Sequence, residues 1–148
     1  MTYKFPLQKV MDHRKNLEGM AQREFQEIQF TMNEEIEKLN KMQSDREDAI
    51  QRRFQIQAKG GNSSSGLQQV HEYLVLQDLR IERQKLHLAE VEKELERRRE
   101  VLRSKAIDYK IMESLREKKK SQHMFEVSRK EQLFLDEIAT VRSRKKKE

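Results

Sequence analysis

The sequence predicts an all-α fold, a two-helix antiparallel coiled-coil hairpin with a longer, overhanging C-terminal helix. Three observations predict it. Charged residues make up 39% of the 148 residues and tryptophan is absent, a composition typical of long helices and not of a globular core. Apolar residues recur every seven positions along most of the chain. Three of the four glycines lie in one octet, KGGNSSSG, which therefore separates two helices of a single coiled-coil domain, residues 1–148.

The first helix is expected over about residues 6–58. One heptad row contains Phe25, Met32 and Leu39, and a second contains Ala21, Ile28, Met42, Ala49 and Ile56. Charged residues interrupt both rows at Glu35, Arg46 and Arg53. The stems of long arginine side chains can lie along apolar surface while their charged ends stay in water, so these interruptions do not exclude a packed seam.

The octet, residues 59–66, is expected to be a hinge loop. Gly60 or Gly61 can end the first helix in the left-handed conformation that favours glycine. Ser65, followed three residues later by Gln68, has the form of a capping box that opens the second helix. Eight residues are enough for the chain to turn back on itself.

The second helix is expected over about residues 67–145, and its heptad is the clearest signal in the chain. Seven apolar residues occupy consecutive a positions, namely Leu67, Leu74, Ile81, Leu88, Leu95, Leu102 and Tyr109. The d positions are mixed, namely Val70, Gln77, Gln84, Val91, Arg98, Lys105 and Met112. Polar d positions are poor for a tight parallel dimer and tolerable in a hairpin.

An antiparallel register follows if the numbers of facing residues add to 123. Leu74 then faces Ala49, and apolar residues meet in most layers. Lys105 faces Glu18, and Met112 faces Met11. The predicted seam residues are Ile28, Met32, Leu39, Met42, Leu74, Ile81, Leu88, Val91, Leu95 and Leu102.

In this register the N-terminal end of the first helix lies near residue 118 of the second helix. Roughly 25 to 30 residues at the C-terminal end of the second helix therefore overhang. The heptad fails there, yet Val127, Phe134, Ile138 and Val141 keep a helical spacing. An apolar stripe without a partner in its own chain indicates a surface for another molecule. We therefore expect these four residues to bind a protein partner, together with the basic Arg142, Arg144 and Lys145.

The positive charge of the chain belongs to its C-terminal part. Residues 118–148 carry ten lysines and arginines against five acids, whereas residues 1–58 and 67–117 are each balanced. These cations suit the negative end of the helix dipole or an acidic protein surface. Nucleic acid is the weakest reading, because aromatic residues that stack on bases are not interleaved with the basic ones.

The sequence contains no pattern expected of an enzyme. It has no cysteine, its four histidines are scattered, and its carboxylates alternate with lysine and arginine as on a solvated helix surface. The octet lacks the Lys-Ser/Thr step of a phosphate-binding loop. We expect no catalysis, no cofactor and no metal. Without a signal peptide or a membrane span, the expected location is the cytoplasm.

Two stretches together resemble the flagellar type III export protein FliJ family. The start YKFPLQKVMDHRKNLEGMAQREFQ is similar to the family's N-terminus, and KIMESLREKKKSQHMFEVSRKEQLFLDEIATVR is similar to its C-terminal signature. The matching C-terminal residues are Glu113, Leu115, Glu131, Gln132, Asp136, Glu137 and Ala139. The resemblance implies a non-enzymatic stalk that binds the hexameric export ATPase, the export gate protein and export chaperones.

Within that resemblance, the expected location is cytoplasmic and peripheral to the inner-membrane export apparatus, with the membrane reached only through the gate. The overhanging helix would enter the ATPase ring and the loop end would point toward the gate. The loop is richer in serine and glycine than a tight turn requires, so gate-binding positions near residues 56–70 are not carried over. Two alternatives remain open: a generic homodimeric coiled-coil scaffold, and a basic nucleic-acid-binding rod.

Overall fold

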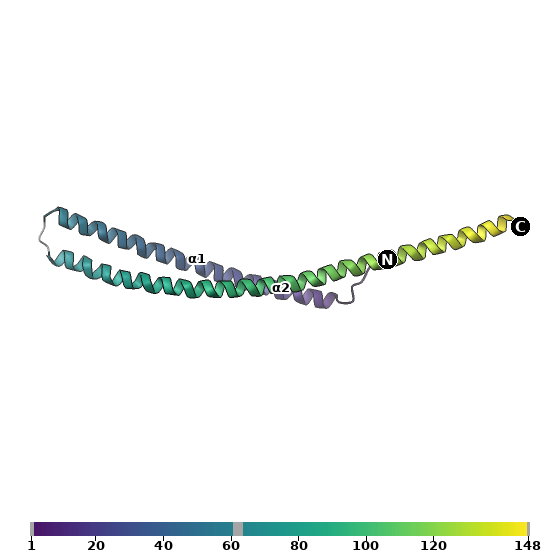
Figure 1. Ribbon diagram of the computed structural model, residues 1–148, viewed down its shortest axis with the longest axis horizontal. Coiled ribbons are helices and arrows are strands. Elements are labelled where there is room, and N and C mark those ends of the chain that lie inside the picture. Colours follow the sequence, from purple (N-terminus) through teal and green to yellow (C-terminus); the bar gives the residue numbers. More distant parts are fainter. Residues whose placement is uncertain (1, 61–63, 148) are drawn as a thin grey trace. The chain divides into compact units, whose positions relative to one another are not determined.

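The computed structural model describes residues 2–60 and 64–147 (Figure 1). Helix α1 spans Gln8–Ala58 and helix α2 spans Ser64–Lys147. The described residues contain no strand. The all-α, coiled-coil hairpin of two packed helices is confirmed. None of the described helices has a stretch both long and apolar enough to cross a membrane.

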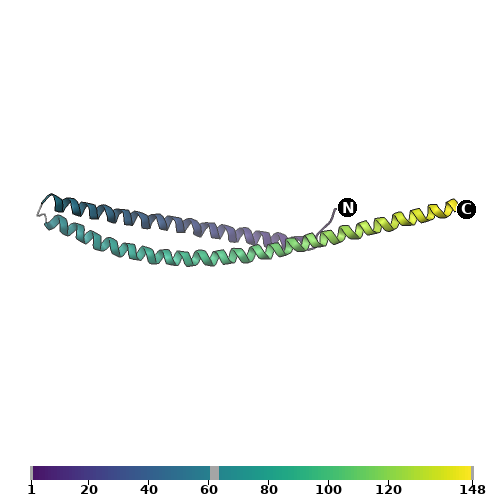
Figure 2. The same ribbon diagram turned by 45° about the horizontal axis from the view of Figure 1, so that its top comes forward.

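The chain divides into two compact units, and both helices contribute to each. The loop unit is Ala21–Leu102, and the terminal unit combines Met1–Met20 with Arg103–Glu148. In the loop unit the two helices lie alongside each other in both views (Figures 1 and 2). They are antiparallel there, because Gln77 contacts Met42 while Arg98, farther along α2, contacts Glu24, farther back on α1.

The seam follows the two predicted heptad rows. Buried seam residues are Leu74, Ile81, Val91 and Leu95, and half-buried ones are Ile28, Met32, Leu39, Met42, Leu88 and Leu102. In the terminal unit Met11 and Met112 share a buried cluster, as the predicted register requires. Lys105 and Glu18, which the register places opposite each other, are both half-buried, but no ion pair joins them among the described residues. Nearby, Arg14 reaches across to the main-chain oxygen of Asp108 at 2.9 Å.

Glycine ends α1 as predicted. Gly60 has a φ of 62°, and its N–H donates to the main-chain oxygen of Gln57 at 3.2 Å. This is one of the two hydrogen bonds of a Schellman cap. A left-handed residue without a Cβ atom therefore satisfies a carbonyl that the last turn leaves free.

The start of α2 differs from the prediction. The helix begins at Ser64 and not near residue 67, so the last three residues of the expected hinge are helical. Ser65 is then inside the first turn, which excludes it as the N-cap of a box with Gln68. Residues 61–63 of the predicted hinge, with Gly61, lie outside the described residues.

A non-helical segment precedes α1 and packs on α2 within the terminal unit. We call residues 3–7 the strap. Phe5 is only 8% exposed and packs with Met11 and Met112, and the ring of Tyr3 lies 5.3 Å from the ring of His123. The chain thus covers α2 as far as His123, beyond the limit near residue 118 that the helix lengths predicted.

Candidate functional site

The four apolar residues predicted to bind a partner lie on α2 beyond the strap, and we call them the docking face: Val127, Phe134, Ile138 and Val141. Phe134 is 63% exposed and Val141 is 52% exposed, whereas Val127 and Ile138 are half-buried by their neighbours on the helix. Within the terminal unit, no other segment lies beside this yellow end of α2 in Figures 1 and 2. The docking face therefore has no partner among the described residues of the terminal unit.

Further apolar side chains surround the same stretch of helix. Successive residues of an α-helix are rotated by about 100°, so Phe125 projects from the side opposite Phe134. Phe125 is 70% exposed. The other large apolar residues that are exposed in this stretch are Met124, Leu133 and Leu135. The end of α2 thus presents apolar groups in several directions, an arrangement suited to a partner that encloses the helix.

The last turn of α2 is basic. Arg144 and Lys145 belong to it, Arg142 lies just before, and all three side chains are exposed. None of them forms an ion pair with another described residue. These cations adjoin the docking face, so a partner that fits both needs apolar groups bordered by acidic ones.

A second apolar stripe lies on the outward side of α2 in the loop unit, and sequence reasoning missed it. We call Leu76, Leu79 and Leu86 the outward stripe; each is more than half exposed. Spacings of three and seven place these leucines on one side of the helix. The sequence contains that spacing, but the heptad of apolar a positions is the stronger pattern and lies on the opposite side of the helix.

Buried charge in the seam is concentrated around Glu35. Its carboxylate accepts hydrogen bonds from Gln84 at 2.6 Å and from Lys38 at 3.0 Å, and His87 Nε2 lies 3.6 Å away. The hydrogen bond from Gln84, followed by that from Lys38, lowers the pKa of Glu35 below its usual value. The acid that interrupts the heptad is thus held as a paired carboxylate, which stabilises the hairpin and offers no free acid or base.

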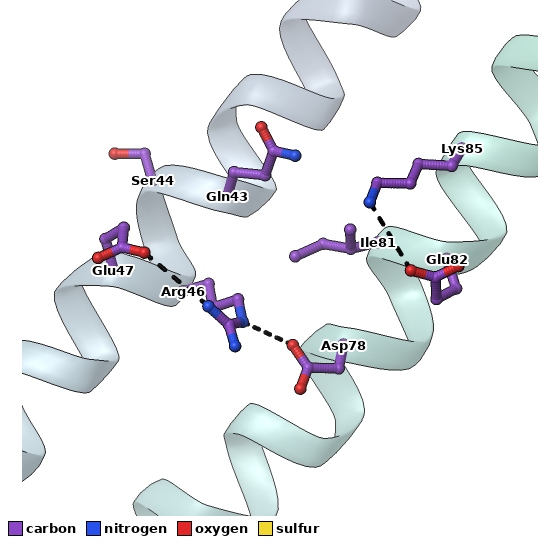
Figure 3. Close-up of a pocket in the computed structure, with 8 residues that line it drawn as sticks. All are labelled: Gln43, Ser44, Arg46, Glu47, Asp78, Ile81, Glu82 and Lys85. Carbon is purple, nitrogen blue, oxygen red and sulfur yellow. Dashed lines mark hydrogen bonds and ion pairs between the residues drawn. The ribbon is translucent and has the colours of Figure 1, made fainter.

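A polar hollow on one side of the loop unit is a further cavity (Figure 3). Arg46 Nε lies 2.6 Å from Asp78 Oδ1 across the two helices, and Lys85 pairs with Glu82 at 3.7 Å. The charged groups that line the hollow are therefore engaged with each other. No group of three potential metal ligands occurs in the described part of the chain.

Comparison with known proteins identifies the family. The family model of the flagellar FliJ protein matches residues 3–148. The solved structure of CT670 from Chlamydia trachomatis, assigned as a YscO homolog, aligns with a TM-score of 0.67 at 21% identity over 95% of this chain and 94% of that one, and shows the same fold. No curated protein matches the sequence. The chain belongs to the FliJ family and is a component of flagellar type III protein export.

Proposed function

We propose that the protein is a non-catalytic stalk that couples the hexameric export ATPase to the export gate, with export chaperones as further partners. One observation carries the proposal: the end of α2 has exposed apolar side chains in several directions, and no other described segment of the terminal unit packs on them. A single flat surface could cover only one of these directions. A ring that surrounds the helix could cover all of them.

The ring would grip the docking face while its acidic groups meet the basic end of α2. Phe134 supplies the largest exposed side chain of the face, and aromatic anchors of this kind dominate interface energies. Arg142, Arg144 and Lys145 would mainly speed association and set the orientation, because rim charges act more on association rates than on affinity.

The outward stripe is our candidate for contact with the export gate. Leu76, Leu79 and Leu86 form a compact apolar surface in the loop unit, separate in sequence from the docking face. Two apolar surfaces on one chain fit a protein that holds two partners at once. A basic nucleic-acid-binding rod would need neither surface.

The experiment is a binding measurement with the purified export ATPase. Phe134→Ala and Ile138→Ala should each weaken binding about tenfold or more, as expected for the centre of an interface. Phe30→Ala is the matched control, because Phe30 on α1 is equally exposed and lies outside the docking face. Truncation within the seam, at Leu67 or Val70, should weaken binding less than truncation at Phe134. The opposite order would reject the docking face.

A second arm uses the gate protein. Leu79→Ala with Leu86→Ala should weaken gate binding and leave ATPase binding unchanged. Solution mass in the same samples tests the scaffold alternative, which requires a stable homodimer with no affinity for either partner.

A further inference from the structure

The strap occupies the same side of α2 as the docking face. Met112 lies under Phe5, and His123 lies against Tyr3. From Met112 to His123 is 11 residues, about three turns or 16 Å along the helix, and Val127 follows one turn later. On one side of α2, residues 3–7 therefore contact the surface around Met112 and at His123, and the same side is open from Val127 onward.

Side chains alone hold the strap. Among the described residues, the main-chain hydrogen bonds of the strap run to the start of α1, from Gln8 N to Phe5 O at 3.1 Å and from Met11 N to Leu7 O at 3.0 Å. No hydrogen bond between the strap and α2 occurs in this part of the chain. Leu7 is 43% exposed and adds little cover. The strap can therefore leave α2 without breaking a hydrogen bond to that helix.

We propose that the strap is a displaceable cover, which a partner that encloses α2 removes in order to extend its grip from Val127 back to Met112. The inference rests on the proposed function, since the partner is the ATPase ring. In the free protein Tyr3 and Phe5 protect the apolar residues Tyr109, Met112 and Leu115 from water. In the complex the ring replaces them, and the strap limits how far the ring advances until then.

A distance measurement tests this directly. The chain has no cysteine, so Thr2→Cys with Gln122→Cys gives two unique, exposed labelling positions beside the intact Tyr3 and His123. Spin labels there should report one short distance in the free protein. Saturating export ATPase should convert it to a long, broad distribution. A short distance that persists while the ATPase is bound overturns the strap proposal and leaves the proposed function standing.

Cross-linking the strap to α2 is a second test of the proposal. A short cross-link between the same two cysteines should weaken ATPase binding about tenfold, and cleavage of the cross-link should restore it. The control is a cross-link between Arg46→Cys and Asp78→Cys, which joins the helices of the loop unit at an existing contact and should not change binding. Equal affinity of the locked and unlocked strap also overturns the proposal. If the unmodified protein fails to bind the ATPase, the proposed function fails and the strap proposal falls with it.

Discussion

Gln84 reaches across the seam to Glu35 and donates to it twice. Its Nε2 lies 2.6 Å from the Glu35 carboxylate and 3.0 Å from the Glu35 main-chain oxygen. Glu35 itself is only 8% exposed. A polar residue at a d position thus meets the one acid that is buried in the described part of α1, and the match exists in a single register.

Removal of the Gln84 side chain should destabilise the hairpin. Gln84→Ala leaves a buried carboxylate with one hydrogen-bonded partner fewer, so we expect the free energy of unfolding to fall by about 2 kcal/mol. Denaturant unfolding at neutral pH measures it. Gln68→Ala is the control, because Gln68 bonds only to Glu72 on its own exposed helix surface. Equal effects of the two substitutions would contradict a stabilising role for the buried layer.

The same layer should make stability depend on acid. The pKa of Glu35 is lowered in the folded protein from an ordinary value of 4.5, so its charged form stabilises the fold. That contribution is complete above pH 4.5 and is lost as the pH falls through the lowered pKa. Unfolding measured from pH 7 to pH 3 should therefore show the advantage of wild type over Glu35→Gln shrinking as the solution becomes acidic.

A substitution of an exposed carboxylate is the control for this pH dependence of the stability difference. Glu34→Gln changes the neighbouring acid, which is exposed, and should leave the difference from wild type small and constant over the same pH range. A Glu35→Gln difference that stays constant with pH would show that the carboxylate contributes nothing through its charge.

Much of the fold could be predicted because the heptad reports burial directly. Leucine or isoleucine every seven residues predicts a packed seam between two helices. Glycine is the residue that most readily adopts a positive φ, so a glycine after the last heptad predicts the end of α1 at Gly60. The polar layers were not predicted, because Gln84 and Glu35 satisfy each other only in three dimensions. The helical start of α2 at Ser64 was not predicted, because small polar residues occur equally in loops and in the first turn of a helix.

The candidate site was predicted in part. The spacing of Val127, Phe134 and Ile138 identifies one side of a helix whatever surrounds it. The strap could not be found in this way, since Tyr3 and Phe5 lie before the helix in a segment without helical periodicity. Alternation of Tyr3 and Phe5 with polar residues was the available signal, and two aromatic residues are too few to indicate where they pack.

Arg98 and its neighbour Arg97 separate cross-seam from local effects. Both donate to Glu94, and the charge of Glu24 on the facing helix also acts on Arg97. Among the described residues, only Arg98 of the two also donates a hydrogen bond to the facing helix, from Nη1 to the main-chain oxygen of Glu24 at 2.9 Å. Arg98→Ala should therefore lower the unfolding midpoint by a few degrees. Arg97→Ala should leave it nearly unchanged, because exposed pairs within one helix contribute little.

Arg97→Ala, which should hardly change the stability, should nevertheless change the pKa of Glu94. The hydrogen bond from Arg97, followed by that from Arg98, lowers the pKa of Glu94 to about 2. Arg97→Ala should raise that pKa toward its ordinary value of 4.5, and NMR titration of the Glu94 side chain would measure it. A variant that moves the pKa and not the unfolding midpoint would show that the local pair is electrostatically real and structurally dispensable. A large loss of stability in Arg97→Ala would contradict this separation.

Alanine substitutions of Gly19, within α1, and of Gly60, at its end, should change the free energy of unfolding in opposite directions. Gly60 has a φ of 62°, a conformation that costs a residue with a Cβ atom about 1 kcal/mol, so Gly60→Ala should destabilise the hairpin by about that amount. Gly19 lies within α1, and a Cβ atom there meets no atom within 4 Å. Gly19→Ala should therefore stabilise the protein by about 0.5–1 kcal/mol, because alanine loses less backbone freedom when a helix forms. Thermal and denaturant unfolding of both variants beside wild type would measure the two signs, and a stabilising Gly60→Ala would show that α1 can end without its left-handed residue.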